Sequence, residues 1–121
     1  INGVAGASSG VIEIGDNVGV GLIDADYLDL SGDGTIDGVR IALDEPVPSV
    51  TAGDDGSAYL TISGTDAPTV GDVAEVGSNR RVIRINISGG TPSATDEATL
   101  SGLDDYAGNG VNGDEDTVTF N

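Results

Sequence analysis

Residues 81–88 read RVIRINIS, and their side chains alternate between two kinds. Arg81 leads a face that continues through Ile83, Ile85 and Ile87, whereas the residues between them are mostly polar. Successive side chains of a β-strand point to opposite faces of a sheet. This stretch therefore predicts a strand with one buried and one wet face, as in an antiparallel sheet.

Residues 39–43, VRIAL, repeat the pattern, with Val39, Ile41 and Leu43 on one face. Two prolines in residues 46–48 suit the exit from this strand, because proline has no N–H for a sheet ladder. Gly, Asn and Asp separate the short apolar runs, and these residues suit turns. Five further runs are expected to be strands: VIEI (11–14), VGVGLI (18–23), AYLTIS (58–63), ATLSGL (98–103) and DTVTF (116–120).

About seven short strands, and no segment with the pattern of a helix of ten or more residues, define the expected fold class. Residues 65–72 and 91–97 are expected to be loops within one domain. The chain is therefore predicted to be all-β, an antiparallel β-sandwich with Greek-key connections.

The composition argues against several classes of binding partner. The 121 residues hold 21 acidic and four basic side chains, a formal net charge of −17, with no Cys, His, Met or Trp, and every basic residue is an arginine. So acidic a chain is not expected to bind nucleic acid or an anionic membrane surface. No run approaches the ~20 apolar residues of a membrane-spanning helix, so no membrane insertion is expected.

The absent residue types also argue against catalysis. Without Cys, His or Lys, the usual nucleophiles, general bases and Schiff-base residues are missing. Acid pairs remain, but they lie in turns of small residues with few apolar neighbours to raise a pKa. We therefore expect the protein not to be an enzyme. Its like-charge excess would destabilise a compact state unless cations are bound or the salt concentration is high.

Residues 1–12 carry no ionisable side chain, which separates them from the acidic remainder at 13–121. One interpretation is a first strand with a frayed terminus. The other is a neutral donor strand that pairs with a second copy of the chain and leaves 13–121 as the sandwich domain. The residues expected to fill a partner's groove are Ile1, Val4, Ala7, Val11 and Ile12.

Residues 29–37, DLSGDGTID, carry oxygen-bearing side chains at alternating positions, and a glycine follows the third. This spacing matches the first nine positions of an EF-hand-type loop, in which carboxylates converge on a hard cation that takes 6–8 oxygens. The sequence therefore predicts a calcium site. The expected ligands are Asp29, Ser31, Asp33, Asp37 and the backbone carbonyl of Thr35.

A true EF-hand is rejected, because Arg40 stands at the twelfth position in place of Glu and no helices flank the loop. What remains is a cation loop between two strands, or a turn whose carboxylates only cap backbone N–H groups. In the first case another acid would complete the site, and the candidates are Asp24, Asp26, Asp44 and Glu45.

A second acidic cluster spans residues 104–116. It would hold another ion, or contribute Asp104 or Asp105 to the first site, or form a solvated charged loop. The candidate ligands there are Asp104, Asp105 and Asn109. An acidic surface suited to high salt would also explain the charge, although it does not require acids gathered in Gly-bearing turns.

Three ordered stretches resemble a known family: DGTIDGVRI (33–41), DEPV (44–47) and LDDYAGNGV (103–111). They are similar to the immunoglobulin-like domains repeated in prokaryotic surface-layer and adhesin proteins, over about residues 24–121. The resemblance implies an immunoglobulin-like sandwich, an extracellular location and a structural role, often with calcium. Asp29, Asp33 and Asp37 match that family's acidic loop, and Asp104 with Asn109 matches its D-x-A-G-N ending.

The sequon Asn86-Ile87-Ser88 is consistent with an extracellular or cell-surface location, and alternation places Asn86 on the solvent face. A chance tripeptide is the alternative. Because the chain opens with Ile1, we expect a processed product or a piece of something longer.

These observations favour an extracellular structural protein that forms a homopolymer by N-terminal strand addition, with calcium offsetting the repulsion between acidic copies. The alternative is one calcium-binding repeat of a larger surface-layer or adhesin protein. A module that binds a glycan is a weaker alternative, because Trp is absent and the three tyrosines are scattered.

Overall fold

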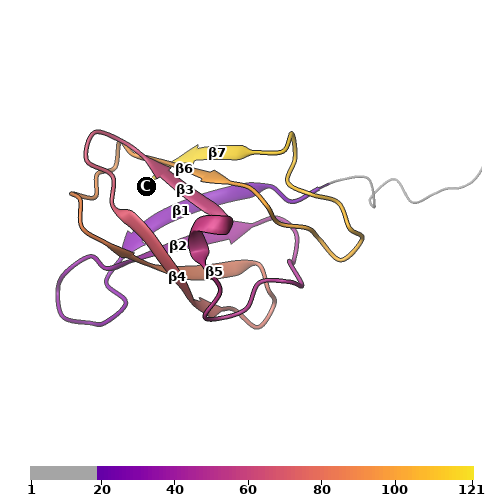
Figure 1. Ribbon diagram of the computed structural model, residues 1–121, viewed down its shortest axis with the longest axis horizontal. Helices are drawn as coiled ribbons and strands as arrows, with labels where there is room; N and C mark the ends of the chain where they lie inside the picture. Colours follow the sequence, from indigo (N-terminus) through magenta and orange to yellow (C-terminus); the bar gives the residue numbers. More distant parts are fainter. Residues whose placement is uncertain (1–18) are drawn as a thin grey trace, which may run out of the picture.

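The computed structural model describes residues 19–121, which form seven strands and one short 3-10 helix (Figure 1). In chain order they are β1 (Leu22–Leu28), β2 (Gly38–Leu43), the 3-10 helix η2 (Gly56–Ala58), β3 (Leu60–Ser63), β4 (Thr69–Val76), β5 (Val82–Ser88), β6 (Glu97–Leu100) and β7 (Asp116–Thr119).

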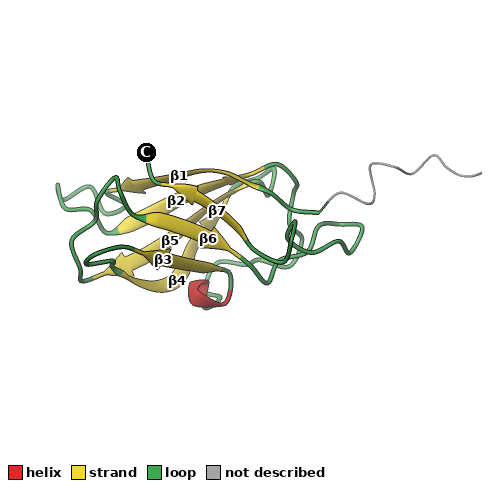
Figure 2. Cartoon of the chain, turned by 90° about the horizontal axis from the view of Figure 1, so that it is seen from above, coloured by secondary structure: helices red, strands yellow, loops and turns green. Residues whose placement is uncertain are grey.

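The strands form two sheets that pack face to face (Figure 2). One sheet has the order β1-β2-β5-β4, the other has the order β3-β6-β7, and all ladder pairs within them are antiparallel. This is the strand order of the constant-type immunoglobulin sandwich, with strands one, two, five and four in one layer. The predicted all-β, immunoglobulin-like sandwich of seven strands with Greek-key connections is confirmed.

The alternation in β2 and β5 predicted the buried face correctly. Ile83, Ile85 and Ile87 are buried in the sandwich, as is Ile41 on the neighbouring strand. Ile41 and Ile83 are direct cross-strand partners, so apolar side chains meet at the centre of the four-stranded sheet. Aliphatic residues provide nearly all of the core, and Phe120 is the one buried aromatic side chain among the described residues.

One of the seven predicted strands differs from the observed set. The run at 11–14 lies outside the described residues, and the seventh strand is instead β4, which begins inside the stretch 65–72 that was expected to be a loop. Only Val73 of β4 is fully buried, and the register shifts twice, between Val70 and Val73 and again before Glu75. The bulges break the two-residue period, so no alternation marks this edge strand.

The first strand lies further along the chain than predicted. We expected residues 18–23, whereas β1 spans Leu22–Leu28. Asp24 and Asp26 interrupt the apolar run, but they alternate with inward-facing Ala25 and Tyr27. Both acids are therefore compatible with a strand that has one solvent face.

Arg80 stabilises the loop that follows β2, where the backbone forms no ladder. Its guanidinium donates hydrogen bonds to the carbonyl oxygens of Val47, Pro48 and Val50. Arg80 has a φ of 58°, an uncommon conformation for a residue with a side chain. Three bonds to backbone carbonyls, two of them from residues whose side chains are fully buried, offset that cost.

A hydrogen bond between partly buried Tyr27 and buried Asp96 links the two sheets at the end of β1. The Tyr27 hydroxyl donates to an Asp96 carboxylate oxygen over 2.7 Å, and the ring stacks on Phe120 with centroids 4.0 Å apart. Asp96 is 1% exposed and also accepts the Ser93 N–H. Burial, followed by the bond to Asp96, raises the pKa of Tyr27 well above its ordinary value of 10.0.

This arrangement predicts instability in alkali. Tyrosine is the main titrating side chain between about pH 8 and 12, because the chain has no Cys, His or Lys. The unfolded chain loses the Tyr27 proton first, so the free energy of unfolding should fall as the pH rises above 10.

Denaturant unfolding of the wild type and Tyr27→Phe across this range is the measurement. The variant should lose about 1–3 kcal/mol at neutral pH, because the buried Asp96 carboxylate loses a donor, and its alkaline fall should be shallower. Equal alkaline falls in both proteins would contradict the assignment.

Candidate metal centre

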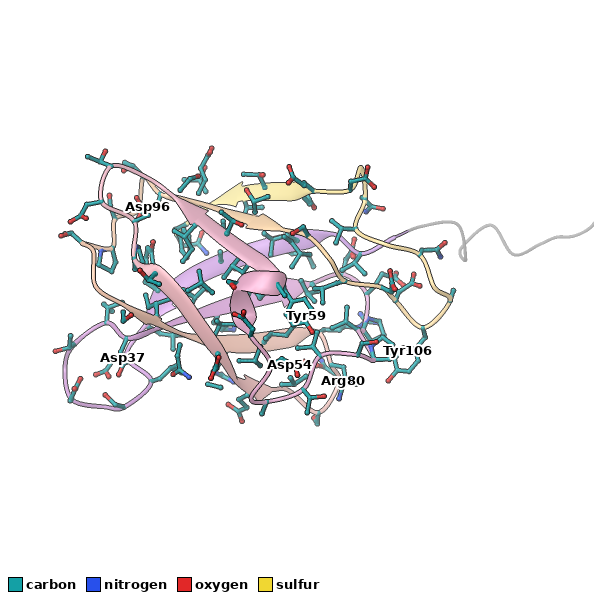
Figure 3. All side chains as sticks on the ribbon, in the orientation of Figure 1. Asp37, Asp54, Tyr59, Arg80, Asp96 and Tyr106 are labelled. Carbon is teal, nitrogen blue, oxygen red and sulfur yellow. The ribbon has the colours of Figure 1, made fainter. Side chains whose placement is uncertain are left out.

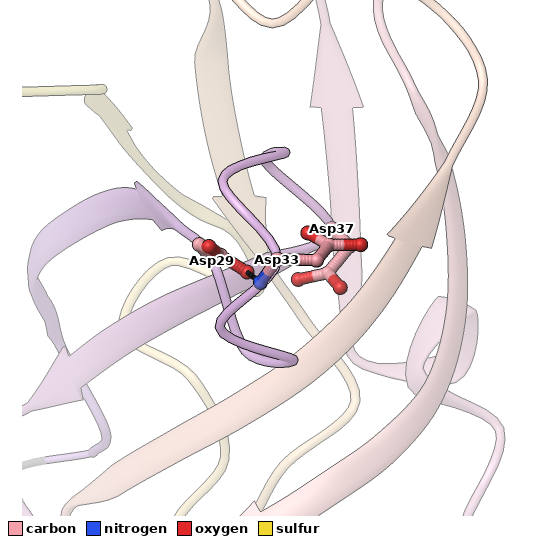
Figure 4. A group of neighbouring side chains, drawn as sticks. All are labelled: Asp29, Asp33 and Asp37. Carbon is pink, nitrogen blue, oxygen red and sulfur yellow. Dashed lines mark hydrogen bonds between the residues drawn. The ribbon is translucent and has the colours of Figure 1, made fainter.

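The β1–β2 connection brings three carboxylates together. One carboxylate oxygen from each of Asp29, Asp33 and Asp37 lies within 4.8 Å of the others (Figure 4). Asp29 directly follows β1 and Asp37 directly precedes β2, so the hairpin fixes both ends of the loop. Asp37 is anchored further, because its N–H donates to the Leu28 carbonyl and its own carbonyl accepts from Ile87.

Backbone N–H groups orient these carboxylates. Asp29 accepts from Gly32 over 2.8 Å, from Asp33 over 3.2 Å and from Gly34 over 2.6 Å. The two glycines have φ angles of 78° and 88°, a conformation that favours glycine and lets the chain wrap around one carboxylate. The Asp37 carboxylate accepts the N–H of Leu30 over 2.6 Å.

The same bonds affect the acidity of Asp29. The Gly34 N–H contributes most to holding the pKa of the Asp29 carboxyl below its ordinary value of 3.8, with smaller contributions from Gly32, Asp33 and Ser31. Asp29 is therefore ionised at neutral pH. The ion pairs among the described residues are Arg40–Asp26 and Arg84–Glu75, so neither involves the three loop carboxylates.

Ser31 and Thr35 take different places in the loop. The Ser31 hydroxyl donates to Asp29 over 3.3 Å, which places its oxygen beside the cluster. The N–H of Thr35 donates to Asp33 over 2.9 Å, so this residue orients a second carboxylate. Its predicted role as a carbonyl ligand stays a prediction.

The acids proposed to complete the site lie elsewhere. Asp26 pairs with Arg40 over 3.1 Å, and the Asn121 amide donates to both Asp24 and Asp26. Asp44 accepts the N–H of Gly21, at the opposite end of the hairpin from the loop. The structure therefore does not group Asp24, Asp26, Asp44 or Glu45 with the three loop carboxylates, and completion of the site by a further acid stays a prediction.

The second acidic cluster forms a separate structure. Asp105 is 5% exposed and accepts the N–H groups of Ala107 and Asn109, each over 2.9 Å. The bond from Asn109 contributes most to lowering the pKa of Asp105. Figure 3 shows Tyr106 and Asp37 at opposite ends of the sandwich, so neither Asp104 nor Asp105 reaches the first site. A separate ion there, with Asp104, Asp105 and Asn109 as ligands, stays a prediction.

The sequon residue Asn86 is exposed on the outer face of β5, as alternation predicted. Its side-chain amide donates to the Asp72 carbonyl over 3.2 Å. Glycosylation of Asn86 stays a prediction. The five assembly residues Ile1, Val4, Ala7, Val11 and Ile12 lie outside the described residues.

Sequence reasoning missed the polar residues that the core requires. Asp96 falls in the stretch 91–97 that the sequence predicts to be a loop, yet it is buried. No local pattern marks Arg80, which donates to three backbone carbonyls. One signal for Asp96 was available: Tyr27 shares the inward face of β1 with Ala25, and a buried tyrosine hydroxyl requires a hydrogen-bond partner.

Comparison with known proteins finds no relative, because no protein family model, curated protein or solved structure matches this chain significantly. The described residues contain no pocket and no helix long and apolar enough to cross a membrane.

The loop geometry predicts an unusually acidic Asp29. Titration followed by carboxyl NMR shifts should give a pKa below 3.8, and the stability from these bonds should be lost as the pH falls through that lowered value. Ser31→Ala should change the pKa little, because the Gly34 N–H contributes most. A midpoint at or above 3.8 would show that the N–H groups do not hold the carboxylate in solution.

Proposed function

We propose that this protein is an extracellular structural domain whose β1–β2 loop binds calcium. The convergence of Asp29, Asp33 and Asp37 carries the proposal. Three ionised carboxylates repel one another at this separation, and a divalent cation between them would convert the repulsion into attraction. The fold supports a structural role only by analogy, since sandwiches of this architecture serve many functions.

Calcium suits the available ligands. It takes 6–8 oxygens in flexible geometry, and carboxylates bind it through one or two oxygens. Asp29, Asp33 and Asp37 would supply the charge, Ser31 and the Thr35 carbonyl would add neutral oxygens, and water would complete the shell. Magnesium fits less well, because it demands near-ideal octahedral geometry and dehydrates reluctantly.

The hydrogen bonds already made within the loop are compatible with this role. An ionised carboxylate has two oxygens and about four acceptor positions. Asp29 Oδ1 accepts from Ser31, Gly32 and Asp33. Asp29 Oδ2 accepts only the Gly34 N–H among the described residues, so this oxygen retains an acceptor position for a cation. The same donors would keep the carboxylate oriented before the ion arrives, which reduces the entropy lost on binding.

Calcium should stabilise the wild type in proportion to its occupancy, by about 2.7 kcal/mol at a hundredfold excess over the dissociation constant. Asp33→Asn should remove most of this gain, whereas Glu97→Gln, which deletes one exposed acid of β6 outside both acidic clusters, should retain it. Calorimetric titration and thermal unfolding with calcium or chelator provide the measurement. Equal responses from both variants would indicate diffuse screening of charge and not a site.

We also propose that residues 1–12 mediate assembly by adding a strand to another copy. All seven strands of the described residues lie between residues 22 and 119. Strand addition uses main-chain hydrogen bonds at a sheet edge, and a segment without charge avoids the repulsion between acidic copies. One repeat of a larger surface protein is the alternative, in which these residues link neighbouring domains.

Sedimentation and negative-stain imaging distinguish the two proposals. With millimolar calcium the full chain should form filaments, and removal of residues 1–12 or addition of chelator should leave monomers. Val4→Asp should weaken assembly, because a charge would enter the pairing face, whereas Asn2→Asp, at a position not assigned to the groove, serves as a matched control. A monomer under every condition would contradict assembly through residues 1–12 and favour the alternative, one repeat of a larger surface protein.

A further inference from the structure

The beginning of the described chain is bonded along the last segment. Five hydrogen bonds with a backbone N–H donor join residues 19–25 to residues 110–121. They run from Gly19 N–H to Asn112 Oδ1 (2.9 Å), Val20 N–H to the Gly110 carbonyl (2.9 Å), Asn112 N–H to the Val20 carbonyl (2.9 Å), Leu22 N–H to Asp116 Oδ2 (2.8 Å) and Asn121 N–H to the Ala25 carbonyl (3.0 Å). We call this set the terminal seam.

The two sides of the terminal seam run parallel. Val20 and Val111 form a parallel bridge, and the partners advance together from Val20 to Ala25. The arrows of β1 and β7 accordingly point the same way in Figure 1. The described chain therefore starts at one end of the seam, while residue 121 lies at its other end beside Ala25.

The terminal seam is closely packed, and buried apolar side chains cover its inner side. A Cβ atom at Gly19 would lie 2.0 Å from the Gly110 carbonyl oxygen, so the two backbones approach too closely for any side chain there. Val20, Leu22, Val111 and Phe120 are all at most 7% exposed. Apolar side chains therefore limit the access of water molecules that would compete for these hydrogen bonds.

We propose that the terminal seam gives the domain its resistance to unfolding under tension applied along the chain. Force that pulls residue 19 and residue 121 apart along the strands acts parallel to both sides of the seam. Parallel sides load all five bonds together, whereas antiparallel neighbours pulled from adjacent ends would open one bond at a time. The domain would then withstand tension passed through it from residue 19 to residue 121.

Two side-chain acceptors allow the terminal seam to be weakened without changing the backbone. Asp116→Ala removes the acceptor of the Leu22 N–H, and Asn112→Ala removes that of the Gly19 N–H. Asp55→Ala is a matched control, because Asp55 also accepts a backbone N–H, that of Ser57, but it lies beside η2 and outside the seam. Asp116→Asn keeps an acceptor oxygen and should restore most of the resistance.

Single-molecule unfolding of the full chain at constant force, held at both ends and in chelator, tests the proposal. Asp116→Ala should unfold at least about tenfold faster than the wild type, and Asp55→Ala within about twofold of it. Asn112→Ala provides a second reading if Asp116→Ala does not fold. The proposal is overturned if the seam variants unfold at the wild-type rate, or if Asp55→Ala accelerates unfolding as much as they do.

This inference depends on the proposed structural role only for its biological meaning. The force measurement is made without calcium and involves no loop carboxylate, whereas the calcium titration involves no residue of the terminal seam. A negative result in the force measurement therefore does not contradict the calcium proposal, and a negative calcium titration does not contradict the terminal seam.

Discussion

Backbone N–H groups in the turns of this sandwich donate repeatedly to aspartate carboxylates. A carboxylate one carbon from the backbone reaches N–H groups a few residues away, whereas the longer glutamate side chain reaches them less readily. This difference gives a physical reason for the excess of Asp over Glu in a chain rich in glycine turns. Nine aspartates of the described residues accept a backbone N–H: Asp29, Asp33, Asp37, Asp44, Asp54, Asp55, Asp96, Asp105 and Asp116.

The same interaction links the fold to the proposed calcium loop. Carboxylates that hold turns must stay ionised to accept strongly, and their charge accumulates to a formal −17. Where a turn holds a single carboxylate, no second carboxylate lies close enough to repel it strongly. Where Asp29, Asp33 and Asp37 converge, the repulsion is larger, and the proposed cation would relieve it. Stability and the proposed function thus depend on one kind of group, used singly in most turns and threefold in one loop.

Local sequence patterns predicted those features of the structure that depend on residues close together in the chain. Alternation identified β2 and β5, and the spacing within 29–37 predicted that three acids would meet. Contacts between distant residues were not predictable in this way. Asp96 bonds Tyr27 across 69 residues and Asp116 bonds Leu22 across 94, and nothing in either stretch identifies its partner.

Edge strands posed a related difficulty. β4 carries Gly71 and Asp72 and two register shifts, so its sequence resembles a loop although it pairs with β5. β4 is a strand because it pairs with β5, whose own alternation is clear. The outward aspartates of β1 misled in a similar way, because a polar solvent face was mistaken for the end of a strand.

Calcium binding at the β1–β2 loop is best tested by a crystal structure grown with calcium, with anomalous differences recorded. We expect one strong anomalous peak about 2.3–2.6 Å from carboxylate oxygens of Asp29, Asp33 and Asp37. An empty loop at saturating calcium, with the three carboxylates turned apart, would contradict it and leave the aspartates as caps for the turn.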